Sequence, residues 1–221
     1  MTTAILAAGE TNWNRLAGPF QEAIVDTLVM VGTTLVIGGL CGLILGMLLY
    51  TTRAGGILQN KFIFGLLNIL VNFVRPIPFI ILLVTLGPLT KALVGSQIGR
   101  DAAIVGMSVA ATFGVARIVE QNLVTIDPGM IEAARAMGAS PWQIITGVII
   151  REALGPLVLG YTFCFIAIVD MSAMAGYIGG GGLGDFAITK GYRAFNLEVT
   201  YVTTFMLIII ALSYTHLTLP T

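Results

Sequence analysis

Five apolar stretches, four of them longer than 20 residues and a shorter fifth, constrain the fold of this chain more than any other feature. A helix that crosses about 30 Å of hydrocarbon needs roughly 20 apolar residues, because each residue advances about 1.5 Å. Backbone groups inside a bilayer must satisfy their hydrogen bonds within the protein, which helices do and isolated strands do not. We therefore predict an all-α membrane protein with five transmembrane helices, over residues 24–50, 62–89, 102–124, 153–178 and from 199 to about 212.

The composition excludes several classes of function. Hydrophobic residues make up 57% of the 221 residues and charged residues only 10%, which is outside the range of ordinary soluble domains. Eleven basic and eleven acidic side chains cancel, so the chain offers no basic surface for nucleic acid. The apolar stretches contain no histidine, no metal-ligand cluster and no carboxylates at a catalytic spacing. We expect no catalytic residue, no metal and no cofactor site in this chain.

The ends of the chain differ from the apolar middle. Residues 1–22 contain Glu10 and lack both a basic start and a long apolar run, so we interpret them as a short leader to the first span and not as a cleaved signal peptide. Residues 23–214 form the predicted five-span domain. The fifth span stops being apolar near Leu212 and no basic residue follows it, so we interpret residues 215–221 as an atypical tail, either truncated or foreign.

Prolines and small residues predict details of the spans. Pro76 and Pro78 should bend or interrupt the second span, and Asn68, Asn72 and Arg75 share a face that should meet protein instead of lipid. Small residues repeat every four positions in the first and third spans, which favours close helix packing there. These residues are Gly38, Gly42 and Gly46, and Ala102, Gly106, Ala110 and Gly114. The glycines of 179–184 favour an irregular turn over a dinucleotide loop, because a helical span precedes them.

The polar segment 127–151, between the third and fourth spans, has clear helix signals. Asp127 can cap a helix that begins at Pro128, and Gly138 can end it in a left-handed conformation. Ser140 and Gln143 have the spacing of a capping box, which predicts a second helix leading into the fourth span. On the residues alone, an ordinary interfacial loop is equally consistent with this pattern.

Within this segment, "EAARAMGASPWQII" at 132–145 resembles the EAA loop of permease subunits of ATP-binding-cassette importers. Those permeases have a core of five spans and a short coupling helix that docks in a cleft of the cytoplasmic ATPase. Two further segments, "RPIPFIILL" at 75–83 and "SAMAGYIGGGGLG" at 172–184, together with the EAA stretch, resemble the methionine-importer permeases. The resemblance extends over residues 20–212.

The resemblance implies a location and a set of partners. It places segment 127–151, the coupling loop, in the cytoplasm and the leader outside, whereas the loop charges, five basic residues on each side, do not decide the orientation. It implies a multi-pass homodimer in the bacterial cytoplasmic membrane, a solute-binding protein outside, and a separate ATPase that binds ATP and Mg. The residues that match the docking motif are Glu132, Ala133, Ala134, Gly138, Ala139 and Ser140. Arg151 stands where relatives often have proline, so the second coupling helix should continue into the fourth span.

The candidate translocation pathway lies in the fourth span, at Asp170, Met171, Ser172, Met174 and Tyr177. Because a carboxylate near a bilayer centre costs about 2.5–3.5 kcal/mol, Asp170 should meet an aqueous cavity or a partner charge. It contacts either a substrate ammonium or a basic residue of an outer loop, and the methionines either pack adaptably or close a gate. The expected function is ATP-driven import of methionine by alternating access. The alternatives are an importer of another amino acid or small solute, and an ATP-independent ion-coupled carrier with Asp170 as its proton site.

Overall fold

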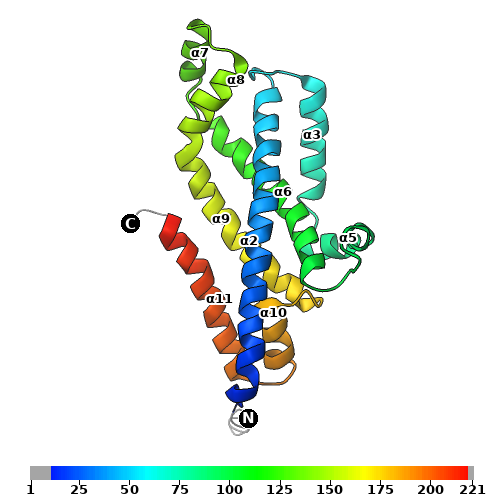
Figure 1. Cartoon of the computed structure of the whole chain (residues 1–221). Coiled ribbons are helices and arrows are strands. Elements are labelled where there is room, and N and C mark those ends of the chain that lie inside the picture. Colours follow the sequence, from blue (N-terminus) through cyan, green and yellow to red (C-terminus); the bar gives the residue numbers. More distant parts are fainter. Residues whose placement is uncertain (1–10, 219–221) are drawn as a thin grey trace. The chain divides into compact units, whose positions relative to one another are not determined.

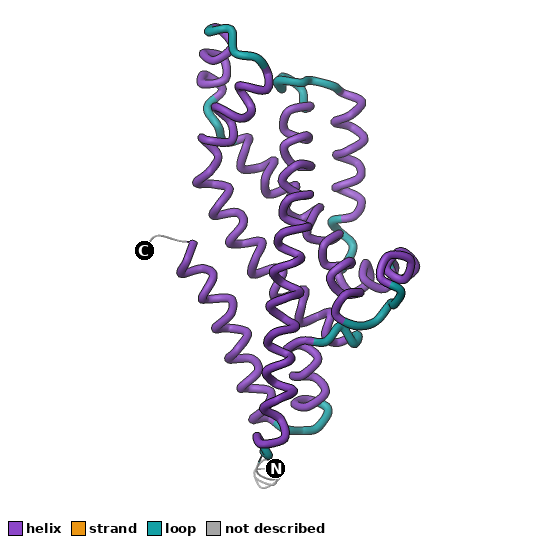
Figure 2. The backbone as a smooth tube through the Cα atoms, in the orientation of Figure 1, coloured by secondary structure: helices purple, strands orange, loops and turns teal. Residues whose placement is uncertain are grey.

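The computed structural model describes residues 11–218, and every regular element in that part of the chain is a helix (Figures 1 and 2). Contacts divide the chain into two compact units that are described separately here. Unit 1 comprises Met1–Thr34, Phe79–Met107 and Phe165–Thr221, and unit 2 comprises Leu35–Pro78 and Ser108–Cys164. Three long helices begin in one unit and end in the other.

Four helical segments are long and apolar enough to cross a membrane. They are α2 (Trp13–Thr52), α6 (Arg100–Val124), the continuous run Pro141–Tyr177 that ends in α9 (Ile150–Tyr177), and α11 (Leu197–Thr218), whose apolar part is Leu197–Tyr214. The pair α3 (Lys61–Val74) and α4 (Phe79–Thr85) makes a fifth span if the two are counted together. Their axes are bent by 105° at the Pro76–Pro78 break, as the sequence predicted. The all-α membrane fold is confirmed, with four helical spans and a bent pair that makes the fifth if it is counted as one span.

The first helix is longer than expected, because α2 begins at Trp13 and the predicted span began at residue 24. The additional turns are amphipathic. Phe20 and Ala23 pack with Leu183 and Phe186 in an apolar cluster of unit 1. A hydropathy criterion detects length and apolarity but not this packing, so it missed the start of the helix. Residues 1–10 of the expected leader and residues 219–221 of the expected tail lie outside the described residues, and α11 continues through Thr218.

The glycines of α2 pack against α6 inside unit 2. A Cβ atom added to Gly42 would lie 2.5 Å from the Cβ of Val115, and one added to Gly46 would lie 2.7 Å from the Cβ of Val119. The predicted close approach of the first span is therefore confirmed. The α6 face that meets these glycines is not the small-residue stripe of the third span, since Gly114 has no neighbouring atom within 4 Å of its Cβ position.

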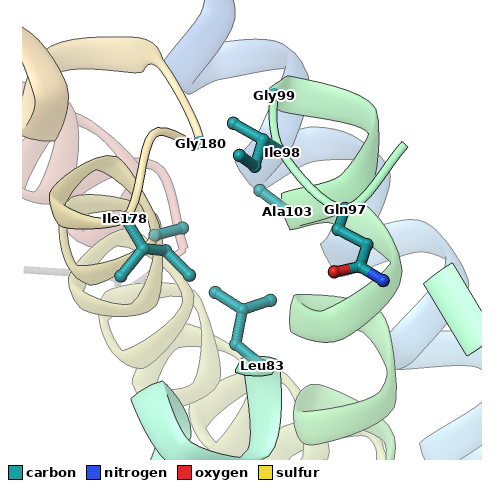
Figure 3. Close-up of a pocket in the computed structure, with 8 residues that line it drawn as sticks. Leu83, Gln97, Ile98, Gly99, Ala103, Ile178 and Gly180 are labelled. Atoms are coloured by element: carbon teal, nitrogen blue, oxygen red, sulfur yellow. The ribbon is translucent and has the colours of Figure 1, made fainter. Parts of the chain in front are cut away.

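A glycine turn follows α9 in unit 1 and leads into α10 (Gly182–Phe186), the π-helix η2 (Ala187–Tyr192) and α11. Gly179, Gly181 and Gly182 have positive φ, which confirms the predicted irregular turn. The Gly99 N–H donates to the Gly179 carbonyl at 3.0 Å. Figure 3 shows how Leu83, Gln97, Ile98 and the turn enclose a cavity of about 10 Å³, which is at most the size of a water site and far too small for a solute.

Candidate coupling and transport sites

The polar segment between α6 and α9 forms the helix–turn–helix that its signals predicted. Helix α7 (Pro128–Ala136) begins at Pro128, and the Asp127 carboxylate accepts a hydrogen bond from the Gly129 N–H at 2.8 Å. The chain then turns through Met137 and Gly138, which has a φ of +80°. The N-cap, the proline at the first position and the left-handed glycine are confirmed.

A capping box opens the next helix, α8 (Pro141–Ile144). The Ser140 N–H donates to Gln143 Oε1 at 2.8 Å, and the Gln143 N–H donates to Ser140 Oγ at 3.4 Å. The π-helix η1 (Ile145–Ile149) follows and passes directly into α9, so one continuous run extends from Pro141 to Tyr177. The expectation that the helix would continue past Arg151 without a proline break is confirmed.

The solvent-exposed side of α7, which faces away from the apolar cluster of unit 2, carries small residues, and larger exposed residues lie beside them. Ala133 and Ala136 are exposed on it, and Glu132 is exposed next to them. Met137 and Trp142 are also strongly exposed, with 81% and 72% of their surface open. Sequence reasoning did not select these two apolar residues. Their position beside Gly138, in a polar segment where apolar side chains have no core of their own, is the signal that could have found them.

The buried side of α7 packs α7 and α8 against the rest of unit 2. Ala134 is only 4% exposed and belongs to the same apolar cluster as Ile144 and Ile149. Ala139 is half-buried against that cluster, and its N–H donates to the Ala134 carbonyl at 3.1 Å. The side chain of Ala134 thus supports the loop from within, whereas Glu132 and the other predicted docking residues are exposed or half-buried.

The coupling helices share a cavity with the end of α2 in unit 2. This cavity has a volume of about 100 Å³ and includes Tyr50, Arg53, Glu132 and Arg135 in its lining. The Arg53 guanidinium lies 4.4 Å from the centre of the Tyr50 ring, a cation–π contact. Because these side chains line one cavity, the end of α2 and the coupling loop lie beside each other.

The predicted pathway residues of α9 separate into two groups. Asp170, Met174 and Tyr177 are exposed and follow one another at spacings of four and three, so they share a face. Ser172 is buried, and its hydroxyl donates to the Val169 carbonyl at 2.7 Å. Met171 is half-buried. No basic side chain among residues 11–214 forms an ion pair with Asp170, so the expected pairing with an outer loop is absent there.

Up to five apolar spans identify this chain as a multi-pass membrane protein with an exposed, capped helix pair between two of its spans. Residues 38–219 match the binding-protein-dependent transport system inner membrane component family, and the chain belongs to that family. It is therefore a multi-pass protein of the inner membrane.

Several similar proteins are named for the transport of methionine. The chain is 41% identical to the probable D-methionine transport system permease protein MetI of Vibrio cholerae serotype O1, over 84% of this chain and 82% of that protein. It is also 41% identical to the methionine import system permease protein MetP of Bacillus subtilis (strain 168), over 74% and 73% of the two chains. Its fold is similar to a chain of the MetNI methionine ABC transporter in inward-facing conformations. That match has a TM-score of 0.89, 40% identity, and coverage of 91% of this chain and 94% of the other.

Proposed function

We propose that this chain is the permease subunit of an ATP-driven methionine importer. The observation that carries this proposal is the similarity, over more than four-fifths of both chains, to a permease named for D-methionine transport. The likeness to a chain of the MetNI methionine ABC transporter supports the same substrate. The permease supplies the membrane path and carries out no chemistry. A separate cytoplasmic subunit binds ATP and Mg and hydrolyses the nucleotide.

The ATPase docks on the solvent-exposed side of the coupling loop, in the cytoplasm. The small side chain of Ala133 lets another protein approach the α7 backbone closely, and Glu132 offers a charge at the edge of that contact. The exposed Met137 and Trp142 add apolar surface that a docked subunit would remove from water. Because the helix is continuous from Pro141 to Tyr177, movement of the docked ATPase reaches the membrane as a rigid-body rotation.

Two copies of the permease form the translocation path around a two-fold axis, and a solute-binding protein delivers methionine at the outer face. The exposed face with Asp170, Met174 and Tyr177 borders this path. A carboxylate there cannot face hydrocarbon without a penalty of about 2.5–3.5 kcal/mol near the bilayer centre, whereas an aqueous path keeps it hydrated.

Uptake by proteoliposomes tests this function. The permease, its ATPase and its binding protein are reconstituted together, and uptake of radiolabelled methionine is measured with and without ATP on the ATPase side. Uptake that requires ATP and persists when the proton gradient is collapsed supports the proposal. Uptake that follows the proton gradient and ignores ATP would identify an ion-coupled carrier. ATP-dependent uptake of a different amino acid, with none of methionine, would identify another importer.

A further inference from the structure

Unit 2 contains a groove of about 640 Å³ that the coupling loop and the predicted pathway do not use. Its lining comes from the end of α3, from the last turns of α6 and from the first half of α9. Six of the residues that line it matter here: Arg75, Gln121, Asn122, Leu159, Gly160 and Phe163. A groove of this size is large enough for a small solute, since ligand pockets occupy about 300–1,000 Å³.

The first side of the groove carries a positive charge that has no acidic partner. Arg75 is the residue after the last turn of α3, is exposed, and has no carboxylate within ion-pair distance among residues 11–214. Helix α3 has 14 residues from Lys61, so Arg75 lies about 21 Å from the cytoplasmic end of that helix at about 1.5 Å per residue. A guanidinium at this depth must face water, protein or a bound anion, because hydrocarbon cannot solvate it.

The groove lining also carries two side-chain amides, and that of Asn122 is held in place by a hydrogen bond. Asn122 Nδ2 donates to the Pro156 carbonyl of α9 at 2.9 Å. A Cβ atom added to Gly160 would lie 2.6 Å from that same nitrogen, so the glycine is what allows α9 to approach the amide. The Asn122 Oδ1 atom accepts no hydrogen bond from residues 11–214, and the neighbouring Gln121 is exposed. Two amide oxygens are thus available to a donor in the groove.

Apolar side chains complete the lining. Phe163 lines the groove with 67% of its surface exposed, and Ile118 and Leu159 line it as well. Thioether sulfur makes favourable contacts with aromatic rings, and flexible apolar side chains adapt to surfaces of this kind. The groove therefore combines a cation, uncharged acceptors and an apolar wall, which are the three features that an apolar α-amino acid requires.

We infer that this groove is a substrate site in the membrane for the zwitterion of an apolar α-amino acid, with Arg75 as the contact for its carboxylate. The ammonium group faces the amide oxygens of Gln121 and Asn122, and the side chain packs against Phe163. This inference rests on the proposed function, which supplies methionine as the solute.

Direct binding tests the site. The complex of permease and ATPase is placed in nanodiscs of neutral lipid without the binding protein, and the affinity for radiolabelled methionine is measured. Removing a charge-assisted contact by Arg75→Gln should weaken binding about tenfold to a hundredfold. Arg75→Lys, which keeps the charge, should recover part of that loss. Arg15→Gln removes an exposed charge from the far part of α2 and should bind as the unaltered protein does.

A second ligand separates a carboxylate contact from a structural effect. Methionine amide has no carboxylate, so it should compete weakly and equally well in the unaltered protein and in Arg75→Gln. Equal methionine affinity in both proteins would overturn the inference, and so would equal losses for methionine and its amide. Because lipid phosphate is also an anion, nanodiscs with phosphatidylglycerol provide a further arm. If Arg75→Gln changes phosphatidylglycerol retention and leaves methionine binding unaltered, the groove is a lipid site and the inference fails.

Transport by the complete system distinguishes this failure from failure of the proposed function. If the unaltered transporter does not import methionine with ATP, the proposed function is wrong. If it does import methionine and Arg75→Gln has the same KM and maximal rate, only the substrate site is wrong. Co-purification of Arg75→Gln with the ATPase establishes that the variant is folded and assembled in either case.

Discussion

Some charged side chains in this protein pair within the chain, whereas two that belong to the candidate sites, Glu132 and Arg75, have no ion-pair partner among residues 11–214. Arg117 and Glu120 lie 2.6 Å apart within α6, which neutralises two charges inside a span. Arg100 pairs with Asp26 at 3.0 Å. Glu132 has no ion-pair partner among residues 11–214 and is exposed at the coupling loop. The exposed Glu132 carboxylate at this loop is therefore open to a contact with another protein.

Replacing Glu132 with lysine should weaken ATPase docking about tenfold or more, because a charge-assisted contact is lost and a positive charge takes its place. The chain should still insert, since Glu132 packs in no core. Co-purification of the ATPase at increasing dilution measures the effect. Glu22→Lys makes the same charge reversal at an exposed position of α2 and should leave docking unaltered. Full ATPase recovery with both variants would exclude Glu132 from the docking surface.

At the scale of helices, local sequence patterns predict the caps and the turn of the coupling loop. They do not predict contacts between helices that are distant in sequence. The caps at Asp127 and Ser140 and the turn at Gly138 involve neighbours within three residues, so the sequence pattern determines them. The start of α2 at Trp13 depends on Leu183, which is distant in sequence, and no local pattern reveals it. The face of α6 that meets Gly42 was likewise set by the partner helix.

The turn at Gly138 permits a clean test of backbone conformation. Its φ of +80° disfavours any residue with a Cβ, so Gly138→Ala should destabilise the helix pair by about 1 kcal/mol. Gly147 is the matched control, because neither glycine has an atom within 4 Å of its Cβ position and Gly147 is helical. Hydrogen exchange of segment 139–149 should become faster in Gly138→Ala and not in Gly147→Ala. Equal exchange in both variants would show that the turn carries no strain.

The contact between α2 and α6 permits a test of packing. Gly42→Ala places a Cβ 2.5 Å from Val115 and should destabilise the fold by about 1–3 kcal/mol. That loss lowers the melting temperature of the purified protein by about 2–4 °C per kcal/mol. Gly32→Ala, on the same helix with nothing within 4 Å, should be neutral or slightly stabilising. A melting temperature unchanged by Gly42→Ala would mean that the two helices are less closely packed than the structure shows.

At the scale of the molecule, the exposed surface of a single chain is divided among lipid, water and a second copy. Exposure alone does not separate them, since Ile69 of α3 and Met174 of α9 are both exposed, at 69% and 42%. The residues beside each of them distinguish the two kinds of surface. Met174 follows the charged Asp170 by one turn, whereas Ile69 belongs to an apolar stripe with Phe62, Leu66 and Phe73.

Cysteine labelling distinguishes these surfaces. In a background without Cys41 and Cys164, Met174→Cys should react with a water-soluble maleimide if the α9 face borders the aqueous path, as we propose. Ile69→Cys should stay unlabelled in intact membranes and react only after the membrane is dissolved and the protein unfolded. Equal protection of both positions in the assembled, membrane-embedded transporter would place the Asp170 face against lipid or a dry interface.

The candidate sites were partly predictable from the sequence. Glu132 and Gly138 were found because they belong to a local motif. Ser172 was selected with Asp170 and Met174, yet it is buried, since neighbours in sequence point to different sides of a helix. The groove at Arg75 was not predicted, because α3, α6 and α9 contribute to it together and only their packing creates it.

The π-helix η1 has a consequence for how mutations along α8 and α9 should be interpreted. Five residues there widen the helix, so the angular phase of α9 is offset from that of α8. A single helical wheel drawn from Pro141 to Tyr177 would assign residues to the wrong sides. Mutations at the proposed ATPase-docking end and on the proposed solute face should therefore be mapped on two helical wheels with different phases, although one helix connects the two.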